Sequence, residues 1–85
     1  MQVQLLSPNE YEFEDLRYEL SRDRGKPLSP RTLRYWLREI GIERNEAGFY
    51  EHSDLEVLRL WMSLKPQIKT IERFRAILRR KNNAA

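Results

Sequence analysis

The segment between residues 28 and 41 carries its own start and stop signals for a helix, and it constrains the fold more than any other stretch. Ser29 is the type of residue that caps the first free backbone N–H groups of a helix, and Pro30 follows where a missing N–H costs nothing. Gly41 readily adopts the left-handed conformation that ends many helices. These signals predict a helix over residues 30–40.

The expected helix has two unlike faces. On a helical wheel, its basic and aromatic residues fall within about 60° of Arg31; they are Arg31, Arg34, Tyr35 and Arg38. The apolar residues cluster on the opposite side; they are Leu33, Trp36, Leu37 and Ile40. We therefore expect Trp36 to lie mainly in the core, and the basic face is typical of a helix that enters a groove of DNA.

The length of 85 residues predicts a single small domain over residues 1–85. The chain contains no cysteine, which excludes disulfides and thiolate metal sites. No apolar run approaches the roughly 18 residues of a membrane span, and the N-terminus lacks the pattern of a signal peptide. We expect a cytoplasmic protein that does not associate with membranes.

The net charge of +3 conceals alternating blocks of charge. Counting Lys and Arg against Asp and Glu, residues 1–19, 20–38, 39–58 and 59–85 carry net charges of −4, +5, −5 and +7. The basic blocks contain the helix at 30–40 and the C-terminal third. Such segregation favours a polyanionic partner.

The remaining signals predict a mainly helical chain. Ser7, Pro8 and Glu10 form a helix-start signature, and Ser53 and Glu56 form a second one. Pro66 is expected to end or interrupt the helix that begins at Ser53. The expected helices span residues 8–22, 30–40, 54–65 and 67–80. Residues 42–51 suggest two very short strands around a polar turn, and residues 1–6 suggest a lone strand or an arm.

The first two expected helices are joined by a glycine-containing loop, which indicates a helix-turn-helix. The motif Thr-Leu-Arg-Tyr-Trp at 32–36, followed by Arg-Glu at 38–39, Tyr50 and Asp-Leu-Glu at 54–56, resembles the DNA-binding domain of MerR-type transcriptional regulators. The resemblance covers about residues 28–78. It implies a four-helix winged helix-turn-helix fold, with a very short β-hairpin wing over about residues 42–51.

In that fold the helix at 30–40 enters the major groove and the wing contacts the flanking backbone. Arg34 and Tyr35 match positions that contact DNA in the family, and the wheel adds Arg31 and Arg38. The full candidate DNA-binding set is Lys26, Arg31, Thr32, Arg34, Tyr35, Arg38 and Arg44. Two departures are Leu37, where the family usually has Glu, and Gly48, where an Arg normally precedes the wing's Tyr.

Two functions are compatible with these observations. The first is a small DNA-binding protein that acts as a transcriptional regulator or as an excisionase-like accessory factor, with double-stranded DNA and either a second copy or a partner protein as its partners. The alternative is a winged-helix protein–protein interaction module without intrinsic DNA binding.

We do not expect an enzyme. His52 is the lone histidine, without the second His or Cys of a typical zinc site, and no catalytic or phosphate-binding motif is present. We therefore expect no catalytic residues, metal or cofactor. The chain ends after the fourth expected helix, without the coiled coil and effector domain usual in the family, so no small-molecule ligand is expected.

Overall fold

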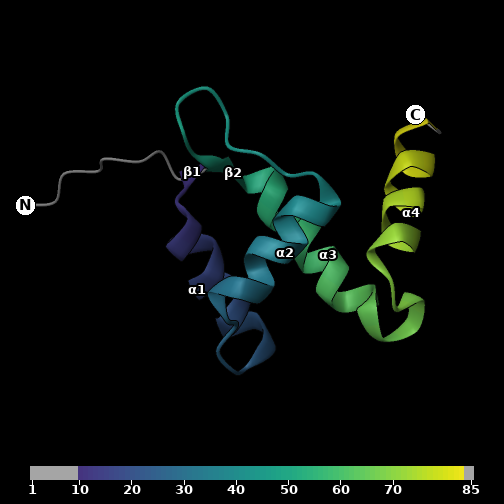
Figure 1. Ribbon diagram of the computed structural model, residues 1–85, viewed down its shortest axis with the longest axis horizontal. Helices are drawn as coiled ribbons and strands as arrows, with labels where there is room; N and C mark the ends of the chain where they lie inside the picture. Colours follow the sequence, from purple (N-terminus) through teal and green to yellow (C-terminus); the bar gives the residue numbers. More distant parts are fainter. Residues whose placement is uncertain (1–9, 84–85) are drawn as a thin grey trace, which may run out of the picture.

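The computed structural model describes residues 10–83, and side chains up to residue 80. Within this range the chain is mainly helical, with four helices and one two-stranded antiparallel sheet (Figure 1). In chain order the elements are β1 (Glu10–Tyr11), α1 (Phe13–Arg24), α2 (Pro30–Ile40), β2 (Tyr50–Glu51), α3 (His52–Ile68) and α4 (Ile71–Asn83).

Helix α2 begins and ends at the residues that its local signals indicate. The Ser29 hydroxyl accepts a hydrogen bond from the backbone N–H of Thr32 at 3.1 Å. Gly41 adopts a left-handed φ of 94°, and its N–H donates to the Leu37 carbonyl at 2.9 Å. Because both ends are satisfied locally, this short helix has sharp limits.

Helix α1 starts later than the expected residue 8. Glu12 is its N-cap, and the side chains of Glu12 and Asp15 each accept a hydrogen bond from the other's backbone N–H. Glu10 lies in β1 instead of completing a capping box, while Ser7, Pro8 and the expected strand or arm at residues 1–6 fall outside the described residues. The reciprocal cap therefore moves the start, and the helix runs to Arg24 before Gly25 at φ 76°.

Helices α3 and α4 also depart from their expected limits. Glu51, not Ser53, is the N-cap of α3, and it forms a reciprocal capping box with Asp54. Pro66 lies inside α3. The helix continues past it to Ile68, which is half-buried and packs against the core. The expected end at 65 and the expected start of the last helix at 67 are therefore wrong.

The expected hairpin over residues 42–51 is also wrong in its pairing. Residues 42–44 form no strand, and β2 pairs with β1 in the register Glu10↔Glu51 and Tyr11↔Tyr50. Asn45 closes the loop instead: its side-chain oxygen accepts from the N–H groups of Ala47 and Phe49, both at 3.0 Å. These local bonds satisfy backbone donors that a hairpin ladder would otherwise use.

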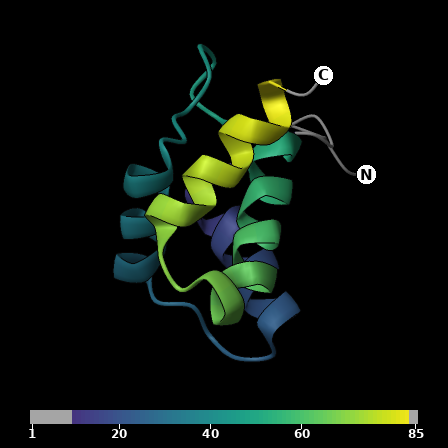
Figure 2. The same ribbon diagram turned by 90° about the vertical axis from the view of Figure 1, so that its right-hand side faces the viewer.

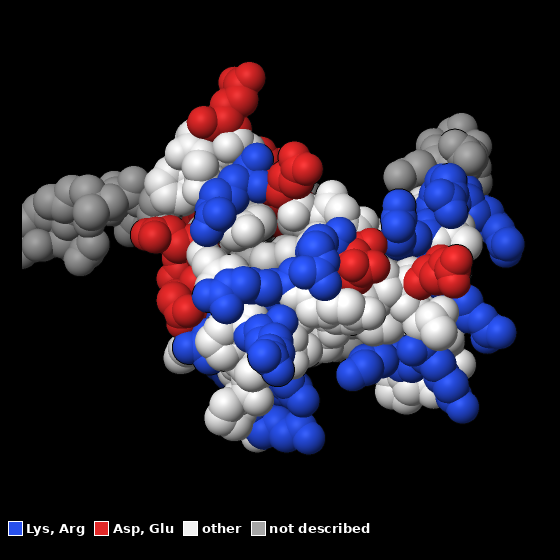
Figure 3. All heavy atoms as spheres, viewed as in Figure 1, with Lys and Arg blue, Asp and Glu red and all other residues white. Residues whose placement is uncertain are grey.

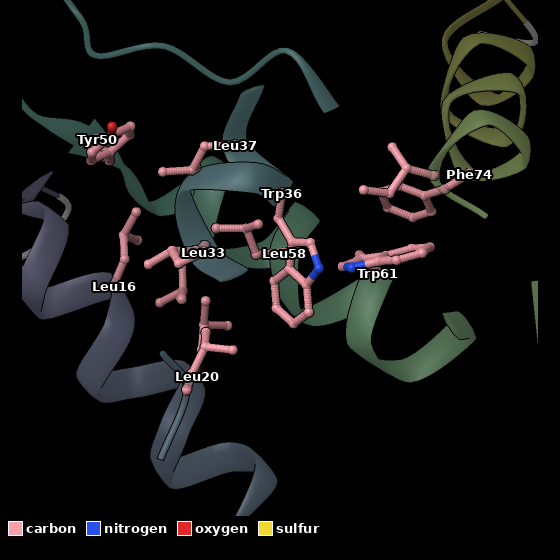
Figure 4. Packing of buried hydrophobic residues seen from close by; sticks show 12 residues of the cluster. Leu16, Leu20, Leu33, Trp36, Leu37, Tyr50, Leu58, Trp61 and Phe74 are labelled. Carbon is pink, nitrogen blue, oxygen red and sulfur yellow. The ribbon is translucent and has the colours of Figure 1, made fainter. Parts of the chain in front are cut away.

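The core lies between α2 and the other three helices. Leucines of α1, α2 and α3 pack at its centre, and the indole of Trp61 lies between Trp36 and Phe74, with ring centroids 6.2 and 5.4 Å away (Figure 4). Trp36 is only 5% exposed, which confirms its expected place in the core. Helix α4 packs against α2 and α3. The outer side of α2 is left uncovered, in front in Figure 1 and at the left in Figure 2.

Candidate nucleic-acid interface

The uncovered side of α2 presents the basic face that the helical wheel predicts. Arg31, Arg34, Tyr35 and Arg38 are exposed and together line a shallow hollow of about 450 Å³. Because their spacing follows the helical repeat, the four side chains leave the helix on one side. Figure 3 shows lysine and arginine side chains running across this part of the surface.

Two of these arginines lie over aromatic rings. The guanidinium carbon of Arg34 is 5.1 Å from the centre of the Phe13 ring, and that of Arg38 is 5.6 Å from the centre of the Tyr35 ring. Arg38 also donates from Nε to the Glu39 carboxylate at 3.2 Å. The outer face of α2 is therefore partly ordered by ring contacts, which orient a guanidinium without neutralising it.

Arg44 reaches the same surface from the loop between α2 and β2. Its guanidinium carbon lies 5.1 Å from the centre of the Tyr50 ring. It lines a second hollow of about 400 Å³ together with Arg34, Arg38 and Phe13. The structure thus places the only basic residue of this loop beside the basic face of α2.

The rest of the loop is acidic. Glu43 and Glu46 are exposed, and no ion pair is recorded for either carboxylate among the described residues. Gly48 has a left-handed φ of 92° and donates its N–H to the Asn45 carbonyl. The loop therefore contributes one cation beside α2 and negative charge elsewhere.

Two other candidate residues lie apart from this face. Thr32 is half-buried, and its hydroxyl accepts a hydrogen bond from the Ser29 hydroxyl at 2.9 Å, so it belongs to the cap of α2. Lys26 is exposed in the loop before α2 and lines a different hollow, with Tyr18 and Arg22 of α1. The structure brings together the four arginines and Tyr35, but it does not add Lys26 to them.

Most charged side chains of α1 described in the structure take part in ion pairs, either within α1 or with α3. Hydrogen bonds from Arg17 to Glu14 hold the pKa of that carboxyl below its usual value, and the charges of Arg17 and Arg34 add to this effect. Arg59 of α3 pairs with Asp23 and Glu19, and the hydrogen bond with Asp23 is the largest cause that raises the pKa of Arg59. The pairs of Arg59 fasten α1 to α3. Together with the Arg17–Glu14 pair within α1, they engage acids that would otherwise weaken the positive potential of α2.

A second basic region lies beside the first. Lys65, Lys69 and Arg75 line a groove of about 540 Å³ between α2, the end of α3 and the start of α4, together with the acids Glu39 and Glu72. The Lys65 ammonium is 5.5 Å from the centre of the Trp36 ring. The side chains of three more arginines of α4 are also exposed: Arg73, Arg79 and Arg80. Parts of the two positive blocks of the sequence thus form two adjoining regions of surface.

Two further polar side chains, those of Trp61 and His52, lie outside the basic face of α2. The buried Trp61 Nε1 has no hydrogen-bond partner among the described residues, and Figure 4 shows it facing the Trp36 side. His52 Nδ1 is 2.9 Å from the Tyr11 hydroxyl, and its Nε2 is 3.3 Å from the Glu56 carboxylate. Both imidazole nitrogens therefore have protein neighbours, and the contact with Tyr11 links β1 to α3.

Sequence reasoning missed Phe13 and Tyr50 as neighbours of the arginines. Phe13 has the helical spacing of a core residue, and Tyr50 follows the polar loop, so each is accounted for without the site. Their approach to Arg34 and Arg44 depends on the packing of α1 and on the pairing of β1 with β2. No local pattern in the sequence reports either contact.

Comparison of the chain with known protein families, with curated proteins and with solved structures found no match. Along the described part of the chain, none of the helices has the length and apolar character needed to cross a membrane.

Proposed function

We propose that the chain is a small cytoplasmic DNA-binding protein of MerR-like winged helix-turn-helix type that acts by binding and not by catalysis. Helix α2 would enter the major groove, and the loop of residues 42–49 would lie near the flanking backbone. The observation that carries this proposal is the gathering of four arginines and Tyr35 on one uncovered face.

The chemistry of this face suits a nucleic acid better than an apolar ligand. Arginine donates several hydrogen bonds in a fixed plane, which matches phosphate oxygens and the acceptors on the major-groove edge of guanine. Tyr35, 48% exposed, offers a ring and a hydroxyl on the same face. A short helix with these groups reads about three or four base pairs.

The size of the face limits the affinity of one copy. Four neutralised phosphates correspond to a slope of about −3.6 in a plot of log K against log salt concentration. A single module of this kind buries roughly 600–1,000 Å² of protein surface on DNA. We therefore propose that the protein works with a second copy or a partner protein, as a transcriptional regulator or as an excisionase-like accessory factor.

The second candidate is a protein–protein interaction module. The exposed carboxylates of Glu43 and Glu46 favour it, because negative charge in the loop opposes contact with a phosphate backbone. In that case the acidic loop and α1 would dock a partner, and the arginines of α2 would be a solvated face.

Fluorescence anisotropy with a labelled random-sequence duplex distinguishes the two functions. We expect micromolar binding at low salt that weakens steeply as salt is added, and loss of that binding in the double variant Arg34→Ala/Arg38→Ala. The matched control is Arg73→Ala/Arg80→Ala on α4, which removes the same charge from another part of the surface. Circular dichroism checks that both variants keep their helices.

Wild-type protein without salt-sensitive binding would refute the DNA-binding proposal and favour the interaction module. An equal loss in both double variants would mean that binding depends on overall charge and not on α2. If the protein binds DNA through α2, selection of bound sites from a random-sequence pool would show whether half-sites repeat. Repeated half-sites would mean that two copies bind together.

A further inference from the structure

Phe13 is the first residue of α1 and lies outside the segment that resembles MerR-type domains. Its side chain is half-buried, and its ring centre is 5.1 Å from the guanidinium carbon of Arg34. It lines the same hollow as Arg38 and Arg44. The first turn of α1 is therefore part of the surface formed by α2 and the loop.

Arg34 differs from the arginines that hold the fold together. Arg17 and Arg59 donate hydrogen bonds to carboxylates, and these bonds occupy their N–H groups. Among the described residues, no hydrogen bond or ion pair is recorded for the Arg34 side chain, and Glu14, whose charge it influences, is bonded to Arg17. The ring of Phe13 meets the guanidinium and leaves its donors available.

This arrangement suits a side chain that must bind an anion or a base edge. A free arginine loses considerable rotamer freedom when it is fixed by a ligand, and partial ordering beforehand lowers that loss. A carboxylate partner would also order the side chain, but it would compete with the ligand for the same donors. An aromatic ring restrains the side chain without that competition.

We propose that Phe13 is a positioning residue, which holds the Arg34 guanidinium toward the DNA with its hydrogen-bond donors free. The inference rests on the proposed function and extends the DNA-binding surface to α1. The contact is partly exposed, so its loss should weaken DNA binding by about two- to fivefold.

The test is a double-mutant cycle measured by anisotropy at low salt. Phe13→Leu keeps an apolar side chain of similar volume but removes the ring, and we expect it to weaken binding two- to fivefold. In the Arg34→Ala background the same substitution should have no further effect. Phe13→Tyr keeps the ring and should bind like the wild type. Tyr18→Leu is the control, because Tyr18 is an exposed aromatic residue of α1 whose ring lies near Arg22.

A second measurement does not depend on DNA. In the free protein, the Nε–Hε NMR signal of Arg34, assigned by its loss in Arg34→Ala, should be displaced by the ring current of Phe13. It should move toward the ordinary arginine position in Phe13→Leu but not in Tyr18→Leu. Thermal unfolding checks that Phe13→Leu remains folded under the conditions used.

The possible outcomes separate the two proposals. If the wild type binds DNA but Phe13→Leu weakens binding equally with and without Arg34, or does not weaken it, the positioning role is refuted. An Arg34 signal that Phe13→Leu leaves in place also refutes it. If the wild type shows no salt-dependent binding, the proposed function fails and the DNA role of Phe13 fails with it, while the NMR signal reports separately on the contact.

Discussion

Arg44 tests whether the loop after α2 lies beside DNA. The residue is the only base in residues 42–51, and it meets Arg34 and Arg38 at one hollow. Four phosphate contacts, from Arg44 and the three arginines of α2, give a salt slope of about −3.6, and removal of one contact leaves about −2.7. A fourfold rise in salt should therefore weaken wild-type binding about 150-fold and Arg44→Ala binding only about 40-fold.

The assay is an anisotropy titration with one duplex at four or more salt concentrations between 50 and 200 mM, which spans the fourfold rise in salt. The control is Arg44→Lys, which keeps the charge but replaces the planar guanidinium over Tyr50. Its slope should match the wild type. If Arg44→Ala binds with an unchanged slope, the loop does not contact the backbone, and the reasoning from the shared hollow is wrong.

Two further predictions concern stability. Leu33 is fully buried beneath the basic face, so Leu33→Ala should lower the free energy of unfolding by about 2–5 kcal/mol, measured by urea denaturation; a loss well below that range would contradict the packing of α2. The lowered pKa of Glu14 means that its pair with Arg17 stabilises the fold above the unfolded carboxyl's value near 4.5, and that this contribution disappears as pH falls through the lower folded value. Glu14→Gln should therefore reduce the loss of stability on acidification, measured as the unfolding midpoint at pH 7 and at successively lower pH, and an unchanged pH dependence would refute the assignment.

The sequence predicted α2 well because the information needed for that helix is local. Ser29, Pro30 and Gly41 act on backbone groups within one turn, and the 3.6-residue repeat separates arginines from apolar residues in any helix that forms there. The same reasoning placed Trp36 in the core, where the structure finds it beside Trp61.

Local signals predicted the ends of α3 less well, because more than one nearby residue could begin or end that helix. Ser53 is a good cap by residue type, yet Glu51 caps α3, because β2 ends there and Asp54 completes the capping box with Glu51. A proline disfavours a helix interior, yet α3 continues two residues past Pro66, where Ile68 packs against the core.

The chain's own pattern thus establishes a capped helix with one basic and one apolar face, while the surroundings of that basic face depend on tertiary structure. The strand Tyr50–Glu51 pairs with Glu10–Tyr11, about forty residues away in the chain, instead of with its neighbour across the loop. That pairing and the packing of α1 place Tyr50 beneath Arg44 and Phe13 beside Arg34. Such contacts join residues far apart in the sequence, and local propensity carries no information about which distant partner a two-residue strand will find.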